Sequence, residues 1–486
     1  MPLAEQIKRL AKHSAIYGLG GLIQRILAIL LLPLYTRYLS PSDYGAIEAL
    51  VALSAVILAL LRAAISNSFF RFYFDADDER RRLLVVRTSF WFTMGAATVA
   101  LAAGLVFAEP ISRALFATGE HADLVRAAFV GLWASMNYDQ LTALFRVEER
   151  SVSYSLASLA NVLLTIGITI LLVVVLDKGP LGVLVGNFSG TLAVYSVLLL
   201  YRRAQLGLQF DRTLFRTMTA FGMPFVPSVI ALSAIDFSDR FFLVKFRDQH
   251  ELGLYAIGVR ISAALLFLLT AFRTAWPAFA FSIRDDGEAR RVFAFVLTYV
   301  VFAASWAALA LGLGSPWLVR LLTTPDFYEG SRAVAPLAFA AVAFGAFAVV
   351  LVSIGRARRT RSNWLLTGSA ALVNLVLNLV LIPPYGLFGA AVSTLAAYVA
   401  MFAGMVWKAQ RVFPVPYQWR RVGLAVGTAV ALTGVGKGFH VGLAAAIGLT
   451  LVYPFALALF GFFLPAERAR FASLAGALSR RAREAR

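Results

Sequence analysis

The feature that most constrains this chain is its succession of long apolar segments. Along the 486 residues, about 14 runs of roughly 20 residues are each long enough to cross a bilayer as a helix. Their predicted starts lie near Ser14, Tyr44, Ser89, Leu124, Ser153, Pro180, Met218, Leu252, Arg291, Arg332, Asn363, Tyr385, Arg421 and Val441. Because a backbone in lipid must satisfy its own hydrogen bonds, these runs predict an all-α polytopic membrane protein.

The distribution of charge predicts the orientation. Only 15% of residues are charged and the formal net charge is +19. This excess fits Lys and Arg in short cytoplasmic loops better than it fits a nucleic-acid partner. With a cytoplasmic N-terminus, the arginine-rich segments at 80–87, 202–216 and 356–361 fall on the cytoplasmic side. We therefore predict that both termini are cytoplasmic and that no nucleic acid is bound.

Two pairs of similar segments suggest an internal repeat. LSPSDYGAIEAL (39–50) resembles DQHELGLYAIG (248–258), and PLGVLVGNFSG (180–190) resembles YGLFGAAVSTL (385–395). Members of each pair open corresponding helices of two successive sets of six. Such repeats are typical of transporters whose substrate site lies between them.

The repeat predicts a domain organisation with two pseudo-symmetric six-helix lobes. The predicted parts are an amphipathic cytoplasmic N-terminus (1–13), an N-lobe (14–203), a cytoplasmic linker (204–217), a C-lobe (218–410), two further helices (411–464) and a basic cytoplasmic tail (465–486). The N-terminus runs into an apolar segment without a small-residue cleavage site, so we do not expect a removable signal peptide.

Charged residues inside the apolar helices are the candidate functional residues, because such residues are costly in a membrane and usually face a protein cavity. Six arginines lie at these positions, against the four acids Glu48, Asp139, Asp236 and Asp239. A guanidinium presents a planar fork of donors that suits phosphate, so the excess of arginine favours an anionic substrate. The predicted substrate-binding residues are Arg25, Arg260, Arg62, Arg273 and Gln24. Arg126 is expected at the membrane interface.

An alternative role for the buried charges is pairing between helices. Asp236 and Arg240 are four residues apart on one helix face and can meet. The residues predicted to form gating contacts or ion pairs are Asp236, Asp239, Arg240, Glu48 and Asp139. We expect AIDFSDRFFL (234–243) to form such a cluster at the external mouth of a cavity whose phosphate-binding charge lies deeper, around Arg25.

Prolines and glycines mark two helices that can bend. Pro224 and Pro227 interrupt the hydrogen bonds of the seventh predicted helix. Gly18 and Gly21 loosen the first helix and allow close packing. Hinges and static kinks both fit this pattern.

Three motifs place the chain among known transporters. LLPLYTRYLSPSDYGAIEAL, the run DRFFLVKF followed by ELGLYAIGVRIS, and VNLVLNLVLIPPYGLFGAAVST resemble the polysaccharide-exporter and O-antigen flippase branch of the multidrug/oligosaccharidyl-lipid/polysaccharide (MOP) exporter superfamily. The resemblance spans roughly residues 10 to 410. It implies an inner-membrane protein, with a fold like MATE transporters and lipid II flippases, that moves undecaprenyl-diphosphate-linked oligosaccharide to the outer leaflet by alternating access.

The resemblance also implies site residues and partners. Lipid II flippases use cavity arginines on their first, second and eighth helices, and here Arg25, Arg62, Arg260 and Arg273 lie on the corresponding helices. The implied partners are the lipid-linked glycan, membrane lipids, and the polysaccharide polymerase with its chain-length machinery. No cofactor is expected, and coupling to Na⁺ or a proton stays open.

Two alternatives remain at this point. A cation-coupled multidrug exporter of the same superfamily would need acidic residues for its cations, whereas the excess here is arginine. A membrane polymerase or ligase of the same pathway would need a sizeable external loop or clustered acid and base residues. The sequence has no HExxH, GxSxG or GxxxxGKS motif, and its four histidines lie in separate segments. We therefore predict that the protein is not an enzyme.

Overall fold

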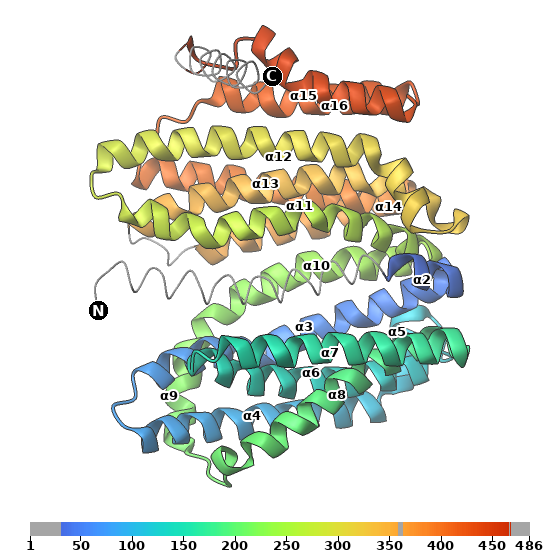
Figure 1. Cartoon of the computed structure of the whole chain (residues 1–486), viewed down its shortest axis with the longest axis vertical. Helices are drawn as coiled ribbons and strands as arrows, with labels where there is room; N and C mark the ends of the chain where they lie inside the picture. Colours follow the sequence, from blue (N-terminus) through green and yellow to red (C-terminus); the bar gives the residue numbers. More distant parts are fainter. Residues whose placement is uncertain (1–30, 358–362, 466, 468–486) are drawn as a thin grey trace, which may run out of the picture. The chain divides into compact units, whose positions relative to one another are not determined.

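Helices make up nearly all of the part of the chain that the computed structural model describes, residues 31–357, 363–465 and 467 (Figure 1). The first half contains α2 (Leu32–Tyr38), α3 (Pro41–Phe74), α4 (Glu79–Val106), α5 (Ala108–Phe116), α6 (Ala122–Val147), α7 (Ser151–Ile170) with the π-helical η1 (Leu171–Val175), and α8 (Gly179–Leu206). The second half contains α9 (Arg212–Gly222), η2 (Met223–Phe225), α10 (Val226–Phe246), α11 (Gln249–Ser282), α12 (Asp286–Leu322), η3 (Pro325–Gly330), α13 (Ser331–Arg356), α14 (Asn363–Val412), α15 (Trp419–Gly438) and α16 (Leu443–Leu459).

The predicted fold class is confirmed. Eight helices of the described residues are long and apolar enough to cross a membrane. Every predicted helix after the first corresponds to an observed helix or to one half of α14; the first lies outside the described residues. The largest boundary difference is in α4, which begins at Glu79 and not near Ser89. Asp78 caps this helix by accepting a hydrogen bond from the Arg81 amide, so Arg80, Arg81 and Arg82 lie in its first turns.

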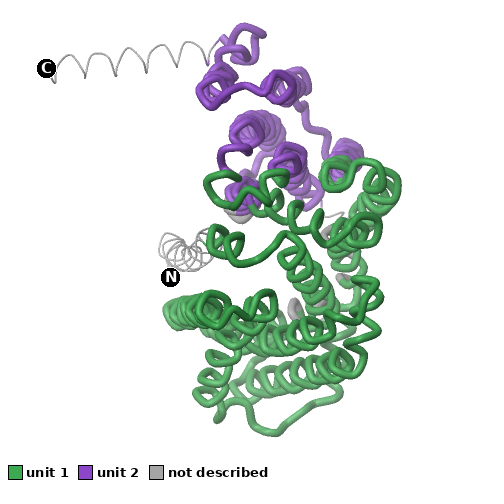
Figure 2. The backbone as a smooth tube through the Cα atoms, turned by 90° about the vertical axis from the view of Figure 1, so that its right-hand side faces the viewer, with its two compact units in different colours: residues 1–260, 319–330, 361–397 green, residues 261–318, 331–360, 398–486 purple. Residues whose placement is uncertain are grey.

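The chain divides into two compact units (Figure 2). Unit 1 comprises Met1–Arg260, Val319–Gly330 and Arg361–Ala397, and unit 2 comprises Ile261–Leu318, Ser331–Thr360 and Tyr398–Arg486. In unit 1, α6 packs on α4 and α8, α7 packs on α8, and α3 packs on α9 and α10. In unit 2, Trp276 of α11 packs on Phe293 of α12 and donates a hydrogen bond to the Val349 carbonyl of α13. The units follow packing and not the predicted repeat, so the lobe boundaries stay a prediction.

The similar segments at 39–50 and 248–258 meet where α3 and α11 begin. A β-carbon on Gly45 would lie 1.9 Å from the Gln249 carbonyl oxygen, and one on Gly253 would lie 1.9 Å from the Pro41 carbonyl oxygen. The contact is therefore reciprocal, since each glycine faces the carbonyl one turn before the other glycine. Only glycine allows two helix backbones to approach this closely.

The second pair of similar segments shares a backbone conformation. Gly179 at the start of α8 has φ of 51°, and Gly386 has φ of 52° within α14. Gly386 divides α14 into two helices, close to the predicted start near Tyr385. Two side chains near the start of α11 form hydrogen bonds with backbone groups at this break. The Leu387 amide donates to Glu251 at 3.0 Å, and Arg247 donates to the Pro384 carbonyl at 3.1 Å.

We expect Gly386→Ala to destabilise the folded state by about 1–3 kcal/mol, because alanine is strained at positive φ. Its β-carbon would also lie 2.0 Å from a Glu251 carboxylate oxygen. Gly368→Ala in the same helix is the control, since a β-carbon there meets nothing within 4 Å. The unfolding temperature of each variant in detergent checks this prediction, and equal unfolding temperatures would contradict it.

The seventh predicted helix is interrupted at the predicted prolines. It consists of α9 and α10, which are joined by the single 3-10 turn η2 that contains Pro224. Pro227 lies in the first turn of α10. A proline lacks the amide hydrogen that an α-helix needs, which explains the local change of helix type. The hinge role of these residues stays a prediction.

Candidate functional site

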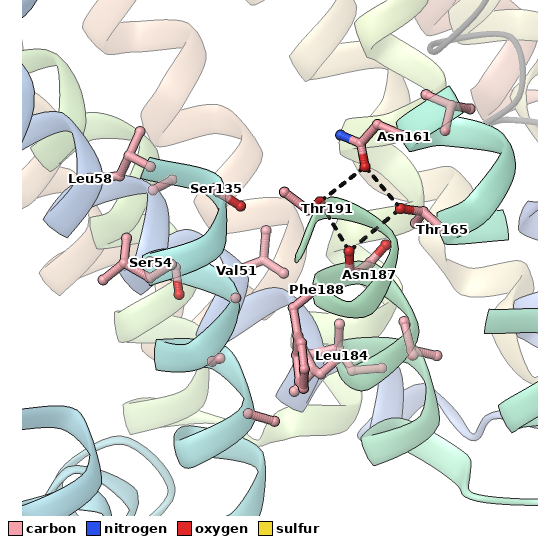
Figure 3. Close-up of a pocket in the computed structure, with 18 of the residues that line it drawn as sticks. Val51, Ser54, Leu58, Ser135, Asn161, Thr165, Leu184, Asn187, Phe188 and Thr191 are labelled. Carbon is pink, nitrogen blue, oxygen red and sulfur yellow. Dashed lines mark hydrogen bonds between the residues drawn. The ribbon is translucent and has the colours of Figure 1, made fainter. Parts of the chain in front are cut away.

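A cavity of about 640 Å³ lies within unit 1. Its walls come from Tyr35 of α2 and from residues of α3, α6, α7 and α8, some of which are labelled in Figure 3. Arg260 of α11 lines the cavity as well. On α3 the lining residues Ile47, Val51, Ser54 and Leu58 are three or four residues apart, so they share one helix face. The volume falls within the range of about 300–1,000 Å³ that is usual for ligand pockets.

An ion pair stands near the end of the cavity where α3 begins. Arg260 donates a hydrogen bond from Nη2 to Glu48 Oε1 at 2.7 Å, and its guanidinium lies 5.0 Å from the centre of the Tyr44 ring. The Arg260 side chain is 30% exposed, compared with 11% for Glu48. Arg260 lines the cavity, so the group presented here is the cation.

A second ion pair stands farther along α3, where Arg62 bonds to Asp139 of α6. Here the exposures are reversed, since the Arg62 side chain is 18% exposed and that of Asp139 is 40% exposed. Asp139 lines the cavity, so the group presented at this end is the anion. Fourteen residues separate Glu48 from Arg62 on α3, which corresponds to about 21 Å along the helix.

α7 and α8 place a set of polar side chains on the cavity wall (Figure 3). Thr191 donates to Asn161 Oδ1 and lies at the same distance, 3.1 Å, from the Asn187 carbonyl oxygen. Thr165 lies 3.3 Å from Asn161 Oδ1. We call Asn161, Thr165, Asn187 and Thr191 the polar ladder. The sequence analysis missed it, although its signal is visible as Asn-x-x-x-Thr at 161–165 and again at 187–191.

Another polar cluster of unit 1 surrounds Asp239, which is 3% exposed. Its carboxylate accepts hydrogen bonds from Tyr255 at 2.7 Å, from Asn378 at 2.6 Å and from Asn374 at 3.2 Å. Thr394 donates to it as well. All four partners are neutral, so hydrogen bonds satisfy the Asp239 carboxylate. The expected pairing of Asp236 with Arg240 stays a prediction. The side chain of Asp236 lies outside the described residues, and Arg240 is half-buried.

The remaining predicted residues fall in three places. Arg273 lies in unit 2, with its guanidinium 4.4 Å from the centre of the Phe344 ring. Arg126 is half-exposed and pairs with Asp123 at 2.6 Å, as a residue at the membrane interface can. Residues outside the described part of the chain are Gly18, Gly21, Gln24 and Arg25. The structure therefore brings Arg260 and Asp139 to one cavity, and each is paired with a residue of α3, Glu48 or Arg62.

Comparison with known proteins gives the family. A family model described as "Polysaccharide biosynthesis protein" matches residues 10–281. The chain belongs to this family. A membrane protein of Haemophilus influenzae, described as uncharacterized, is 23% identical over 289 residues, a match that covers 58% of this chain and 67% of that relative.

Solved structures show the same fold. The lipid II flippase MurJ, in an inward closed conformation, matches with a TM-score of 0.74 at 13% identity, over 92% of this chain and 99% of the flippase. An inward-facing MATE multidrug resistance transporter of the MOP superfamily matches with a TM-score of 0.60 at 16% identity, over 84% of this chain and 98% of the transporter. This member of the polysaccharide biosynthesis family is therefore a multi-pass membrane protein with the MOP fold, as its motifs predicted. Both neighbours are transporters and not enzymes, in agreement with the prediction for this chain.

Proposed function

We propose that the protein is a flippase for undecaprenyl-diphosphate-linked oligosaccharide, which it moves from the cytoplasmic to the outer leaflet of the inner membrane. The observation that carries this proposal is the guanidinium of Arg260, which faces a cavity in a member of a polysaccharide biosynthesis family. A guanidinium stays charged at any relevant pH and matches two phosphate oxygens at once. A diphosphate headgroup is the anion that such a fork suits.

The proposed movement is alternating access. In the predicted orientation, with the N-terminus in the cytoplasm, α3 and α11 begin at the external face, where their reciprocal glycine contact holds the two helices together. Arg260 lies two turns below this contact on α11. A lipid headgroup that enters from the cytoplasmic side would thus reach Arg260 before the external end opens.

Depletion of the protein in its host provides the test. We expect the undecaprenyl-diphosphate-linked repeat unit to accumulate and surface polysaccharide to fall, as measured by mass spectrometry of extracted lipids. In proteoliposomes that hold the purified protein, the same lipid should become accessible to an external glycosidase. Unchanged lipid-linked intermediates on depletion, together with no transfer in proteoliposomes, would contradict the proposal.

The alternative is export of organic cations, and one observation favours it. Asp139 lines the cavity with a carboxylate, as a cation site requires. However, the ion pair with Arg62 neutralises this carboxylate, and the cavity also presents the Arg260 cation. We therefore expect depletion to leave the minimum inhibitory concentrations of ethidium and tetraphenylphosphonium unchanged. Increased sensitivity to both, without a lipid intermediate, would favour the exporter.

A further inference from the structure

The unit 1 cavity also carries polar side chains that take part in no ion pair. From the chemistry of these groups we propose that the cavity is a saccharide subsite, in which Asn187, Ser54, Ser135 and Asp139 bond to sugar hydroxyls while Arg260 holds the adjoining phosphate. This inference rests on the proposed function and adds to it the position of the glycan.

The first argument is that some polar side chains of the cavity wall have unused hydrogen-bonding capacity. Threonine hydroxyls, Asn161 Oδ1 and the Asn187 carbonyl form the bonds within the polar ladder. Among the described residues, no hydrogen bond engages the side-chain amide of Asn187 or the hydroxyls of Ser54 and Ser135, although all three line the cavity. Figure 3 draws the two serines on one side of the cavity and the polar ladder on the other.

Packing between helices explains only part of this set. Ser, Thr and Asn often bond across helices within a membrane, and two bonds between α7 and α8 are of this kind: that of Thr191 to Asn161 and that of Thr165 to the Asn187 carbonyl. That role does not account for the amide of Asn187 or for the two serines on the opposite wall. Polar groups that face a cavity at membrane depth are costly unless water or a ligand satisfies them.

The second argument is the carboxylate of Asp139. Asp139 is paired with Arg62 yet is the more exposed partner, with 40% against 18% of the side chain exposed. A neutralised carboxylate draws no net cation, but its free lone pairs still accept hydrogen bonds from hydroxyl groups. A sugar ring offers such hydroxyls, whereas a lipid tail would leave Asp139, Asn187 and the serines without partners.

The third argument is the order of groups along the cavity. On α3, Ser54 lies between Glu48, which pairs with Arg260, and Arg62, which pairs with Asp139. On α6, Ser135 lies one turn before Asp139. Aliphatic side chains such as Val51, Leu58 and Leu184 line the same cavity. Ligand pockets are typically mostly apolar with a few placed polar groups that fix orientation. A phosphate followed by sugars matches this order of cation, neutral donors and acceptor.

Equilibrium binding to the full-length protein in lipid nanodiscs tests the proposal. The two probes are undecaprenyl diphosphate and undecaprenyl diphosphate that carries one N-acetylglucosamine, and native mass spectrometry measures their dissociation constants. We expect the wild type to bind the glycosylated lipid about tenfold more tightly, as two added hydrogen bonds would provide. Asn187→Leu should remove most of this preference and leave the affinity for undecaprenyl diphosphate unchanged. Ser135→Ala should reduce the preference less.

Ser196→Ala is the matched control, because Ser196 is exposed on α8 and its hydroxyl bonds within its own helix, to the Leu192 carbonyl. It should keep the full preference. Equal binding of the two lipids by the wild type would overturn the saccharide subsite and leave the flippase proposal intact. An unchanged preference in Asn187→Leu would do the same, provided that the unfolding temperature shows this variant to be correctly folded. Failure of the wild type to bind either lipid would overturn both proposals. Binding of tetraphenylphosphonium to the wild type, without binding of either lipid, would identify a cation site.

Discussion

Arg260→Ala should lower export of the lipid-linked glycan by about 30-fold or more, the equivalent of about 2 kcal/mol. The change removes the only cation among the described residues that line the cavity, and with it the fork that would hold a diphosphate. Arg260→Lys keeps the charge but offers no planar fork, so it should recover export only in part. Transfer of the lipid in proteoliposomes measures each variant.

A loss in Arg260→Ala has a second explanation, since that variant leaves Glu48 buried without its cation. Glu48→Gln combined with Arg260→Ala separates the two causes. If Arg260 only neutralises Glu48, the double variant should regain export, because neither charge is then unpaired. If Arg260 binds the substrate, the double variant should remain as defective as Arg260→Ala. Glu48→Gln alone should retain binding of undecaprenyl diphosphate.

Gly45→Leu should abolish transport, because the leucine side chain would enter the space of the Gln249 carbonyl. Neither backbone can move aside without separating the two helices. We therefore expect α3 and α11 to lie farther apart where they cross. Gly253→Leu should have the same effect for the same reason, since its β-carbon faces the Pro41 carbonyl. Gly95→Leu on α4 is the control, because a β-carbon there meets nothing within 4 Å.

The absence of cysteine from the chain allows a displacement of the start of α11 to be detected by cross-linking. His121 directly precedes α6, and its side chain approaches that of Gln249, the first residue of α11, to 3.1 Å. A short thiol-reactive cross-linker should join His121→Cys to Gln249→Cys in an otherwise unchanged chain, and Gly45→Leu should prevent this. Full cross-linking and normal transport in the Gly45→Leu background would show that the crossing tolerates separation and would refute the prediction.

The sequence alone determined the fold class because length and apolarity suffice to define membrane helices. It located even the break of α14, because the segment YGLFGAAVSTL (385–395) resembles the opening of another helix and a helix start was predicted near Tyr385. It also identified the two charged residues that line the cavity, Arg260 and Asp139, and their partners Glu48 and Arg62, because charge within an apolar run is rare enough to be noticed. The family followed from motifs that lie where α3 and α11 cross and around Gly386.

Tertiary structure decided which of these charges meet and which partner faces the cavity. Arg260 and Glu48 are 212 residues apart, and Arg62 and Asp139 are 77 apart, so no local spacing could pair them. The four-residue spacing of Asp236 and Arg240 predicts a local pair, whereas the partners of Asp239 come from α11 and α14, and no spacing within its own helix points to them. The polar ladder was missed because Asn and Thr within an apolar helix are common as packing groups. Only the three-dimensional contacts show that α7 and α8 turn them toward one cavity.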